Sequence, residues 1–323
     1  MSFTSTKCVL IALALAGGAV CAQATAAPPS LSSDSALRAR YALPASRFAV
    51  IEGETVHYVD EGAKDRPAIL LVHGSFASLL QWNAWAAQLS RHYRVIRYDL
   101  SPAGLSGPSP GNDYSIARRI RVIDGLMDKL GIARFVIVGT SSGGLPAAAY
   151  AAKRPQRVRG VVLNNIAAGP FKIDYAALPQ ALKDAVAADA KHPDHHSPEF
   201  WRQILLNNVV DSAKVTPELV AQWTAFNDRT LGDPAIGKAV TATSSFDRTP
   251  DDLRAITAPA LVLWSGDDHE TTLAIHGQRT LELLGSKDKT LKVVDHCGHM
   301  APLDCPAASL SPVEAFLKTL ARK

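Results

Sequence analysis

The chain lacks several features that would assign it to a class at once. It has only 4 cysteines in 323 residues, no apolar run long enough to cross a bilayer, and no internal repeat or low-complexity tract. These absences exclude a disulfide-rich scaffold and a repeat protein. The net charge of +4 comes without a basic stripe, so we expect no nucleic-acid partner. With 47% hydrophobic residues the chain can instead bury a large core, as one α/β domain with an inserted subdomain or as two domains.

Residues 1–26 have the pattern of a secretory signal peptide. Lys7 precedes a 13-residue apolar run at 8–20, and small-x-small cleavage sites follow it. This run is shorter than the roughly 20 residues that a membrane span needs. Cys21 could be a lipoprotein acylation site, but Val20 stands where a small residue is expected. We expect a periplasmic or secreted protein with no integral membrane segment after the signal is removed.

Removal of that segment would leave Cys297 and Cys305 as the only cysteines. An even pair in an oxidising compartment favours a disulfide. Two separate buried thiols are the alternative, because the sequence does not give the distance between their Cα atoms. The pair brackets His299.

Apolar strands alternate with helical segments along most of the chain. Strands that are apolar throughout, separated by helices, predict an α/β fold with a doubly wound, mostly parallel sheet covered on both faces. The pattern predicts a hairpin at 48–62, strands at 68–72, 93–98, 135–138, 158–163, 260–264 and 290–294, and helices at 82–89, 115–130, 145–152 and 312–320.

One connection breaks this alternation. About 90 residues separate the strand that ends near Leu163 from the strand that begins near Ala260, whereas a simple crossover takes about a dozen. The insertion has no convincing strand and is expected to form a helical cap, with helices at 175–190, 198–209, 217–230 and 234–242. The expected organisation is a signal peptide (1–26), an extended lead (27–45), the first part of the core (46–167), the cap (168–250) and the second part of the core (251–323).

A serine lies at the apex of a predicted strand-turn-helix. The strand at 135–138 runs into Gly139-Thr-Ser-Ser-Gly143, and a helical segment follows at once. A Gly-x-Ser-x-Gly turn holds its serine in strained backbone, and the two glycines remove side chains that would collide there. The five-residue pattern alone is weak, and a plain turn serine is the alternative. Its flanks make Ser141 the candidate nucleophile.

Two later strands end in residues that could activate this serine. The strand at 261–264 is followed by Asp267 and Asp268, and the strand at 291–294 by His296 and His299. A serine hydroxyl needs a base to take its proton and a third group to orient that base. The order serine, acid, histidine fits this requirement, although Asp267 competes with Asp268 and His296 with His299.

An earlier strand end offers no alternative acid. The strand that ends near Leu163 is followed by Asn164 and Asn165. Their amides cannot carry the negative charge that stabilises an imidazolium.

Four further segments carry recognisable motifs. Leu70–Ser75 has a His-Gly pair after a strand, and Tyr98–Ser106 has Ala103 and Leu105 around a single glycine. Leu263–Asp268 has Ser265 where glycine is usual, and Gly298-His299 is followed by Asp304 where glutamate is more usual. These segments resemble the His-Gly oxyanion loop, the Asp-x-x-Gly-x-Gly-x-Ser segment, the acid loop and the histidine loop of the α/β-hydrolase superfamily, in its capped branch. The resemblance covers residues 46–322.

The resemblance implies a role for each matching residue. Ser141 is the nucleophile, His299 the general base and then acid, and Asp268 the orienting carboxylate. The backbone N–H groups of Ser142 and Ser75 form the oxyanion hole, with Phe76 as the alternative to Ser75. The matching aspartate, Asp99, is structural, and no cofactor is implied.

A serine at the apex of this turn, which we call the elbow, limits the classes of reaction to be considered. The related haloalkane dehalogenases and epoxide hydrolases use aspartate there, so hydrolysis of an ester, thioester or lactone through an acyl-enzyme is expected. Carbon–carbon bond hydrolysis and cofactor-free haloperoxidase activity use the same triad and are the alternatives. A non-catalytic ligand-binding protein on the same fold is a further one.

The cap offers candidates for contact with a small-molecule substrate. Together with Phe76 after the oxyanion loop, Trp201 and Trp223 are expected to line an apolar pocket. Packing of the cap on itself would explain the cap aromatics Phe200, Trp201, Trp223 and Phe226 equally well. A cap segment with His192, Asp194, His195 and His196 could bind a metal, but histidine-rich surface loops are common and no metal is expected.

Overall fold

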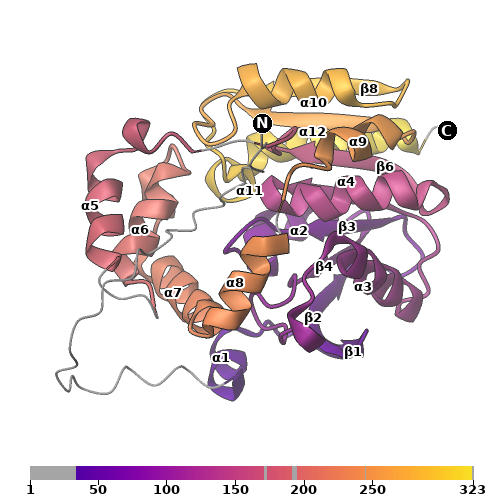
Figure 1. Cartoon of the computed structure of the whole chain (residues 1–323). Helices are drawn as coiled ribbons and strands as arrows, with labels where there is room; N and C mark the ends of the chain where they lie inside the picture. Colours follow the sequence, from indigo (N-terminus) through magenta and orange to yellow (C-terminus); the bar gives the residue numbers. More distant parts are fainter. Residues whose placement is uncertain (1–33, 171–172, 191–194, 244, 322–323) are drawn as a thin grey trace, which may run out of the picture.

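The computed structural model describes residues 34–170, 173–190, 195–243 and 245–321 (Figure 1). The predicted signal peptide lies outside these residues. In the described part of the chain, no helix is both long and apolar enough to cross a membrane.

An eight-stranded sheet forms the centre of the molecule, in the order β1-β2-β4-β3-β5-β6-β7-β8. Strand β2 pairs antiparallel with β1 and β4, and every other pair is parallel. The α/β prediction with a mostly parallel sheet is therefore confirmed. The strands are β1 (Ser46–Ile51), β2 (Glu54–Glu61), β3 (Ala68–Val72), β4 (Arg94–Tyr98), β5 (Phe135–Thr140), β6 (Val158–Asn164), β7 (Ala260–Ser265) and β8 (Lys289–Val294).

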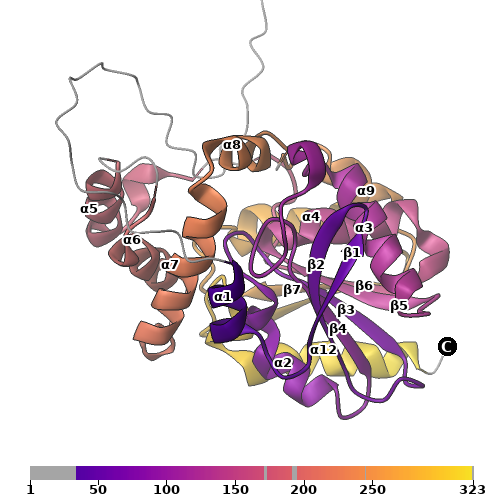
Figure 2. The same cartoon turned by 90° about the horizontal axis from the view of Figure 1, so that it is seen from below.

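Helices cover both faces of this sheet (Figures 1 and 2). Trp82, Trp85 and the buried face of the last helix pack on one side, whereas Ile123 and Tyr150 pack on the other. Every residue of β3 and β5 is buried, which explains why these strands are apolar throughout. The helices of the sheet domain are α2 (Asn83–Leu89), α3 (Ile116–Lys129), α4 (Gly144–Lys153), α9 (Thr249–Ala255), α10 (Gln278–Leu283), α11 (Ala301–Asp304) and α12 (Pro306–Leu320).

The insertion between β6 and β7 is helical, as predicted. It lies beside the sheet domain in both views (Figures 1 and 2). Its own apolar cluster includes Leu182, Trp201, Leu205 and Trp223. The helices are α5 (Gln180–Asp189), α6 (Pro198–Asn207), α7 (Pro217–Leu231) and α8 (Pro234–Thr243).

The N-terminal lead differs from the prediction. It was expected to be extended over 27–45, but α1 (Asp34–Tyr41) is a helix. Leu37 is buried in a cluster with Phe226 of α7, and Arg229 of α7 pairs with Asp34 at 3.1 Å. The helix therefore depends on packing against the cap, which local sequence cannot reveal.

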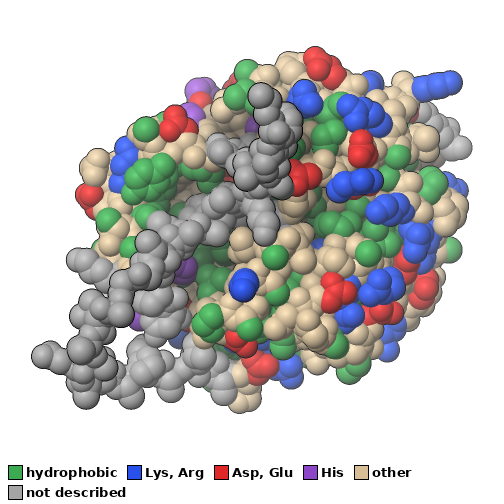
Figure 3. All heavy atoms as spheres, in the orientation of Figure 1, with side chains coloured by type: hydrophobic (Ala, Val, Ile, Leu, Met, Phe, Trp, Pro, Cys, Tyr) green, Lys and Arg blue, Asp and Glu red, His purple; other side chains and the backbone are tan. Residues whose placement is uncertain are grey.

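Figure 3 shows acidic and basic side chains interspersed over the sheet domain on the face in view. This is consistent with the absence of a basic stripe in the sequence.

Parallel pairing brings the key loops to one edge. Thr140 of β5 lies opposite Asn164 of β6, and Asn164 lies opposite Leu263 of β7. The carboxyl ends of parallel strands share one edge of the sheet, where ligand sites of α/β proteins form. The loops after β3, β5, β7 and β8 meet there.

Candidate active site

Ser141 follows β5 in strained backbone. Its φ of 50° lies in the left-handed region, and the helical turn 141–143 and α4 begin there. A Cβ at Gly139 would lie 2.6 Å from the Gly143 carbonyl oxygen, and one at Gly143 would lie 2.3 Å from that of His73. Both glycines of the pattern are needed because backbone segments approach so closely.

The loop after β3 is anchored against this elbow. A Cβ at Gly74 would lie 3.1 Å from the Cβ of Ser141, so any larger residue would crowd the serine. His73 is buried, and its Nε2 accepts a hydrogen bond from the Leu100 N–H at 2.9 Å. Burial lowers the pKa of His73, which keeps the ring neutral. Ser75 Oγ donates to Ser142 Oγ at 2.8 Å, joining the two loops expected to form the oxyanion hole.

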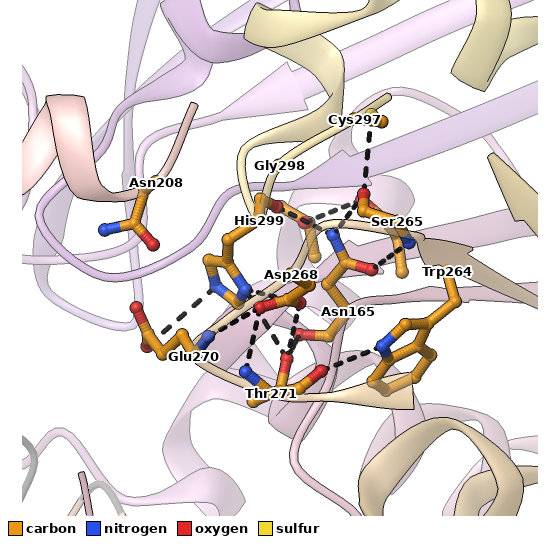
Figure 4. Close-up of polar contacts among 12 residues, drawn as sticks. Asn165, Asn208, Trp264, Ser265, Asp268, Glu270, Thr271, Cys297, Gly298 and His299 are labelled. Atoms are coloured by element: carbon orange, nitrogen blue, oxygen red, sulfur yellow. Dashed lines mark hydrogen bonds and ion pairs between the residues drawn. The ribbon is translucent and has the colours of Figure 1, made fainter. Parts of the chain in front are cut away.

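The structure pairs Asp268 with His299 (Figure 4). Asp268 Oδ2 lies 2.8 Å from His299 Nδ1, and both side chains are buried. The backbone N–H groups of Glu270 and Thr271 donate to Asp268 Oδ1, and the Thr271 hydroxyl donates to Oδ2. These three donors hold the carboxylate in place against His299. Of the alternatives that the sequence left open, Asp268 and His299 are the pair in contact.

The environment of His299 makes its imidazole basic. Burial acts to lower its pKa, but the carboxylates of Asp268 and Glu270 outweigh burial and raise it to about 9. Nε2 of His299 is buried and has no hydrogen-bond partner among the described residues. This nitrogen is the atom that a serine hydroxyl would have to reach.

Ser141 and His299 line one cavity of about 650 Å³. Gly74, Ser75 and Phe76 line it too. Its apolar wall includes residues of the cap and its surroundings, namely Leu178, Leu182, Ile204, Trp223 and Met300. Its polar wall includes His269, Glu270 and His276 from the segment after Asp268. The cavity is therefore lined by both candidate catalytic side chains, with an apolar side and a polar side.

Trp201 differs from the expectation. Phe76 and Trp223 line the cavity of Ser141, whereas Trp201 does not. Trp201 is 0% exposed, and its ring packs 5.3 Å from Phe76 and 5.9 Å from Trp223 between ring centroids. It borders a separate cavity of about 150 Å³ on the Ser142 side of the oxyanion loop. Core packing of the cap therefore explains Trp201.

Asn165 was not predicted to have a part in the site. Its side-chain oxygen accepts from the Ser265 N–H at 2.9 Å, and its Nδ2 donates to Ser265 Oγ and to the His299 carbonyl, both at 2.8 Å (Figure 4). It thereby ties the acid loop to the histidine loop. Its position after β6, at the edge shared with the other loops, was the available signal, but an amide at that position does not by itself predict which loops it joins.

The histidine loop has two further attachments. Asp304 accepts hydrogen bonds from the N–H groups of Gly298, Val210 and Asp211, at 2.7 to 2.9 Å. These bonds connect the loop to the cap segment after α6. Cys297 and Cys305 form the predicted disulfide, with their Cα atoms 5.7 Å apart.

A second Ser-His-Asp arrangement lies elsewhere in the sheet domain. Ser46 Oγ is 2.7 Å from His57 Nε2, and His57 Nδ1 is 2.7 Å from Asp99 Oδ2. Asp99 also accepts from the N–H groups of Leu79 and Leu105, each at 2.7 Å. None of the three residues lines the cavity of Ser141. These contacts agree with the structural role expected for Asp99.

The possible metal site in the cap falls partly outside the described residues, because His192 and Asp194 lie there. His196 Nδ1 lies 2.5 Å from Asp189 Oδ2. Within the described ranges, no group of three or more His, Cys, Asp or Glu side chains could hold a metal ion.

Comparison with known proteins identifies the family. The model of the alpha/beta hydrolase fold family matches residues 67–306. A 2-hydroxy-6-oxo-6-phenylhexa-2,4-dienoate hydrolase of Comamonas testosteroni is 28% identical over 79% of this chain and 90% of its own. A 2-hydroxy-6-oxononadienedioate/2-hydroxy-6-oxononatrienedioate hydrolase of Paraburkholderia phymatum is 30% identical over 78% of this chain and 88% of its own.

Among solved structures, an enol-lactonase from Burkholderia xenovorans LB400 is 24% identical, with a TM-score of 0.64 over 84% of this chain and 100% of its own. At this identity the likeness extends to the fold only. The family match spans most of the chain, and the fold and the strand-turn-helix at Ser141 agree with it. The protein belongs to the alpha/beta hydrolase fold family and is a hydrolase.

Proposed function

We propose that the protein is an exported serine hydrolase that cleaves a carboxylic ester, thioester or lactone. The observation that carries the proposal is that Ser141, in strained backbone, and His299, paired with Asp268, line the same cavity. A nucleophile, a base and an orienting carboxylate are the minimum set for acyl transfer through a covalent intermediate.

The reaction proceeds in two steps, acylation of Ser141 and hydrolysis of the acyl-enzyme. Ser141 Oγ attacks the carbonyl carbon while its proton passes to His299 Nε2, and Asp268 stabilises the imidazolium. The N–H groups of Ser142 and Ser75 stabilise the oxyanion. The bond to the leaving alcohol breaks, and His299 returns the proton to that oxygen. Water activated by His299 then hydrolyses the acyl-enzyme and releases the acid.

The charge of the cavity favours ester cleavage over carbon–carbon bond cleavage. The two curated relatives are named for dienoate and dioate substrates, which carry carboxylates. The described residues that line this cavity include no lysine or arginine, and two of them are the acidic residues Glu270 and Asp174. A substrate carboxylate bound beside them would meet like charge and would find no lysine or arginine to pair with among these residues. Carbon–carbon bond hydrolysis is the second candidate because of these relatives.

Export is supported by two features. The first 26 residues have the charge, apolar run and small-residue sites of a secretory signal. The disulfide between Cys297 and Cys305 suits an oxidising compartment.

The test is hydrolysis of p-nitrophenyl butyrate by the wild type and by Ser141→Ala, with fluorophosphonate labelling of both. We expect labelling and activity in the wild type, and a loss of about 10⁴-fold or more in the variant. Ser46→Ala is the matched control, because Ser46 also contacts a histidine paired with an aspartate, and it should retain activity. Activity that survives Ser141→Ala, or that is lost with Ser46→Ala alone, would contradict the proposal.

A further inference from the structure

Glu270 places a second carboxyl group beside the reacting histidine. Its Oε1 lies 3.9 Å from Nε2 of His299, on the opposite side of the ring from Asp268 (Figure 4). Its side chain is 24% exposed and borders the cavity of Ser141. Its backbone N–H is bound to Asp268 Oδ1 at 2.9 Å, so the residue is held close to the acid loop. In the proposed mechanism the orienting contact to Nδ1 comes from Asp268, and Glu270 is not used.

The chemistry of the proposed reaction identifies the part of the substrate that Glu270 faces. His299 Nε2 takes the proton of Ser141 and gives it to the leaving oxygen of the ester. The alcohol portion must therefore lie next to Nε2 when the bond to it breaks. A carboxyl oxygen 3.9 Å from Nε2 is consequently a neighbour of the alcohol portion.

The surroundings of Glu270 make its charge effective. Its carboxyl lies beside His299, and Asp268 lies on the far side of the His299 ring. The other titratable residues among the described lining of the cavity are His269, His276 and Asp174. Burial raises the pKa of Glu270, His299 opposes this effect, and Asp268 adds to it. Partial burial also reduces screening by water, so a charge on the substrate interacts more strongly here than at an open surface.

We propose that Glu270 is a specificity-determining residue that selects esters with a cationic alcohol portion and disfavours esters whose alcohol portion carries a carboxylate. The inference rests on the proposed ester hydrolysis and specifies its substrate class. Glu270 acts by charge on the bound alcohol and does not take part in bond making.

The test compares butyrate esters whose alcohol portions differ in charge. Butyrylcholine is cationic, 3,3-dimethylbutyl butyrate is its neutral isostere, and 3-(butyryloxy)propanoate is anionic. At pH 8 we expect wild-type kcat/KM to favour butyrylcholine over the neutral isostere by about tenfold, and to disfavour the anionic ester by a similar factor. If turnover is too slow, inhibition constants of the three free alcohols against p-nitrophenyl butyrate give the same ratios.

Two substitutions assign the preference to Glu270. Glu270→Gln keeps the shape and removes the charge, so both ratios should fall to within about twofold of one. Glu270→Lys should reverse them. Glu282→Gln makes the same change at an exposed residue of α10 and should leave the ratios as in the wild type. The ratios do not depend on the fraction of folded enzyme, and titration of active sites with a fluorophosphonate reports that fraction separately.

Wild-type ratios within about threefold of one, or ratios that Glu270→Gln does not change, would overturn the inference. Failure of the proposed function is a different result, because no ester, including p-nitrophenyl butyrate, would then show hydrolysis that depends on Ser141.

Discussion

Two regions of this molecule bring a serine close to a histidine that is paired with an aspartate, one through hydrogen bonds and the other across a shared cavity. Ser46, His57 and Asp99 are connected by two hydrogen bonds of 2.7 Å. In the other region, His299 and Asp268 are bonded at 2.8 Å, while Nε2 of His299 has no hydrogen-bond partner among the described residues. By hydrogen bonding alone, the first set is the more complete triad.

Access to a cavity favours the second region as the catalytic site. Ser141 and His299 share a cavity of about 650 Å³, and none of the residues of the other set lines it. Asp99 is 1% exposed and also accepts hydrogen bonds from the backbone N–H groups of Leu79 and Leu105. A nucleophile must meet a substrate, so an unfilled Nε2 beside a cavity is a better sign of a catalytic site than a closed hydrogen-bond network.

The same substitution at both aspartates should affect the two regions in different ways. Asp268→Asn should lower kcat/KM by about 10⁴-fold, because the amide cannot stabilise the imidazolium or hold its tautomer. Asp99→Asn should instead lower the free energy of unfolding by about 3 kcal/mol. The substitution breaks the buried contact between His57 and Asp99, and it places the N–H donors of the new amide opposite a backbone N–H. Activity measured with p-nitrophenyl butyrate and unfolding in urea separate the two effects.

Activity should be measured at a temperature at which circular dichroism shows both variants to be folded. Loss of activity in folded Asp99→Asn, or full activity in Asp268→Asn, would contradict the assignment of Asp268 to the catalytic site and Asp99 to a structural role.

The pH dependence of kcat/KM tests the environment of His299. His299 can take a proton only when neutral, and its pKa is raised to about 9 by Asp268 and Glu270 against the effect of burial. The kcat/KM of the free enzyme should therefore rise about tenfold for each pH unit and level off above about pH 9. Glu270→Gln removes one of the two carboxylates and should move this limb to lower pH. A limb that stays in place in Glu270→Gln would contradict the electrostatic cause.

The same shift has a consequence for stability. Because the folded pKa of His299 lies above the usual value of about 6.5, its pairing stabilises the fold fully below about pH 6.5. This contribution is lost as the pH rises through about 9. Urea unfolding of the wild type and of His299→Gln across this range would measure it as a pH-dependent difference.

The smallest effect is expected at the disulfide, which only the second region possesses. The bond closes a short loop with a sequence separation of 8 around His299. Its removal in Cys297→Ala/Cys305→Ala should cost about 2.5 kcal/mol of stability. We expect a decrease of only a few fold in kcat, since Asp304 and Asn165 also hold this loop. Thiol titration of the unfolded wild type before and after reduction checks the bond, and a wild type with two free thiols would refute it.

Much of the fold could be predicted from the sequence because its signals are local. Apolar strands between helices predicted the mostly parallel sheet, and the unusually long connection predicted the helical insertion. The helix α1 was missed, since its stability comes from Leu37 and Asp34 meeting α7 about 190 residues later in the chain. Trp201 was assigned to the substrate pocket because composition does not show which face of a cap helix meets the cavity.

By itself, the sequence determined the elbow at Ser141, because only glycine fits where backbone segments approach as closely as they do at residues 139 and 143. It also determined the order of the acid and histidine loops along the chain. Tertiary structure decided the rest. Three features depend on contacts between distant segments, which parallel strand pairing brings to one edge: the pairing of Asp268 with His299, the bonds of Asn165 to both loops, and the position of Glu270 beside Nε2 of His299.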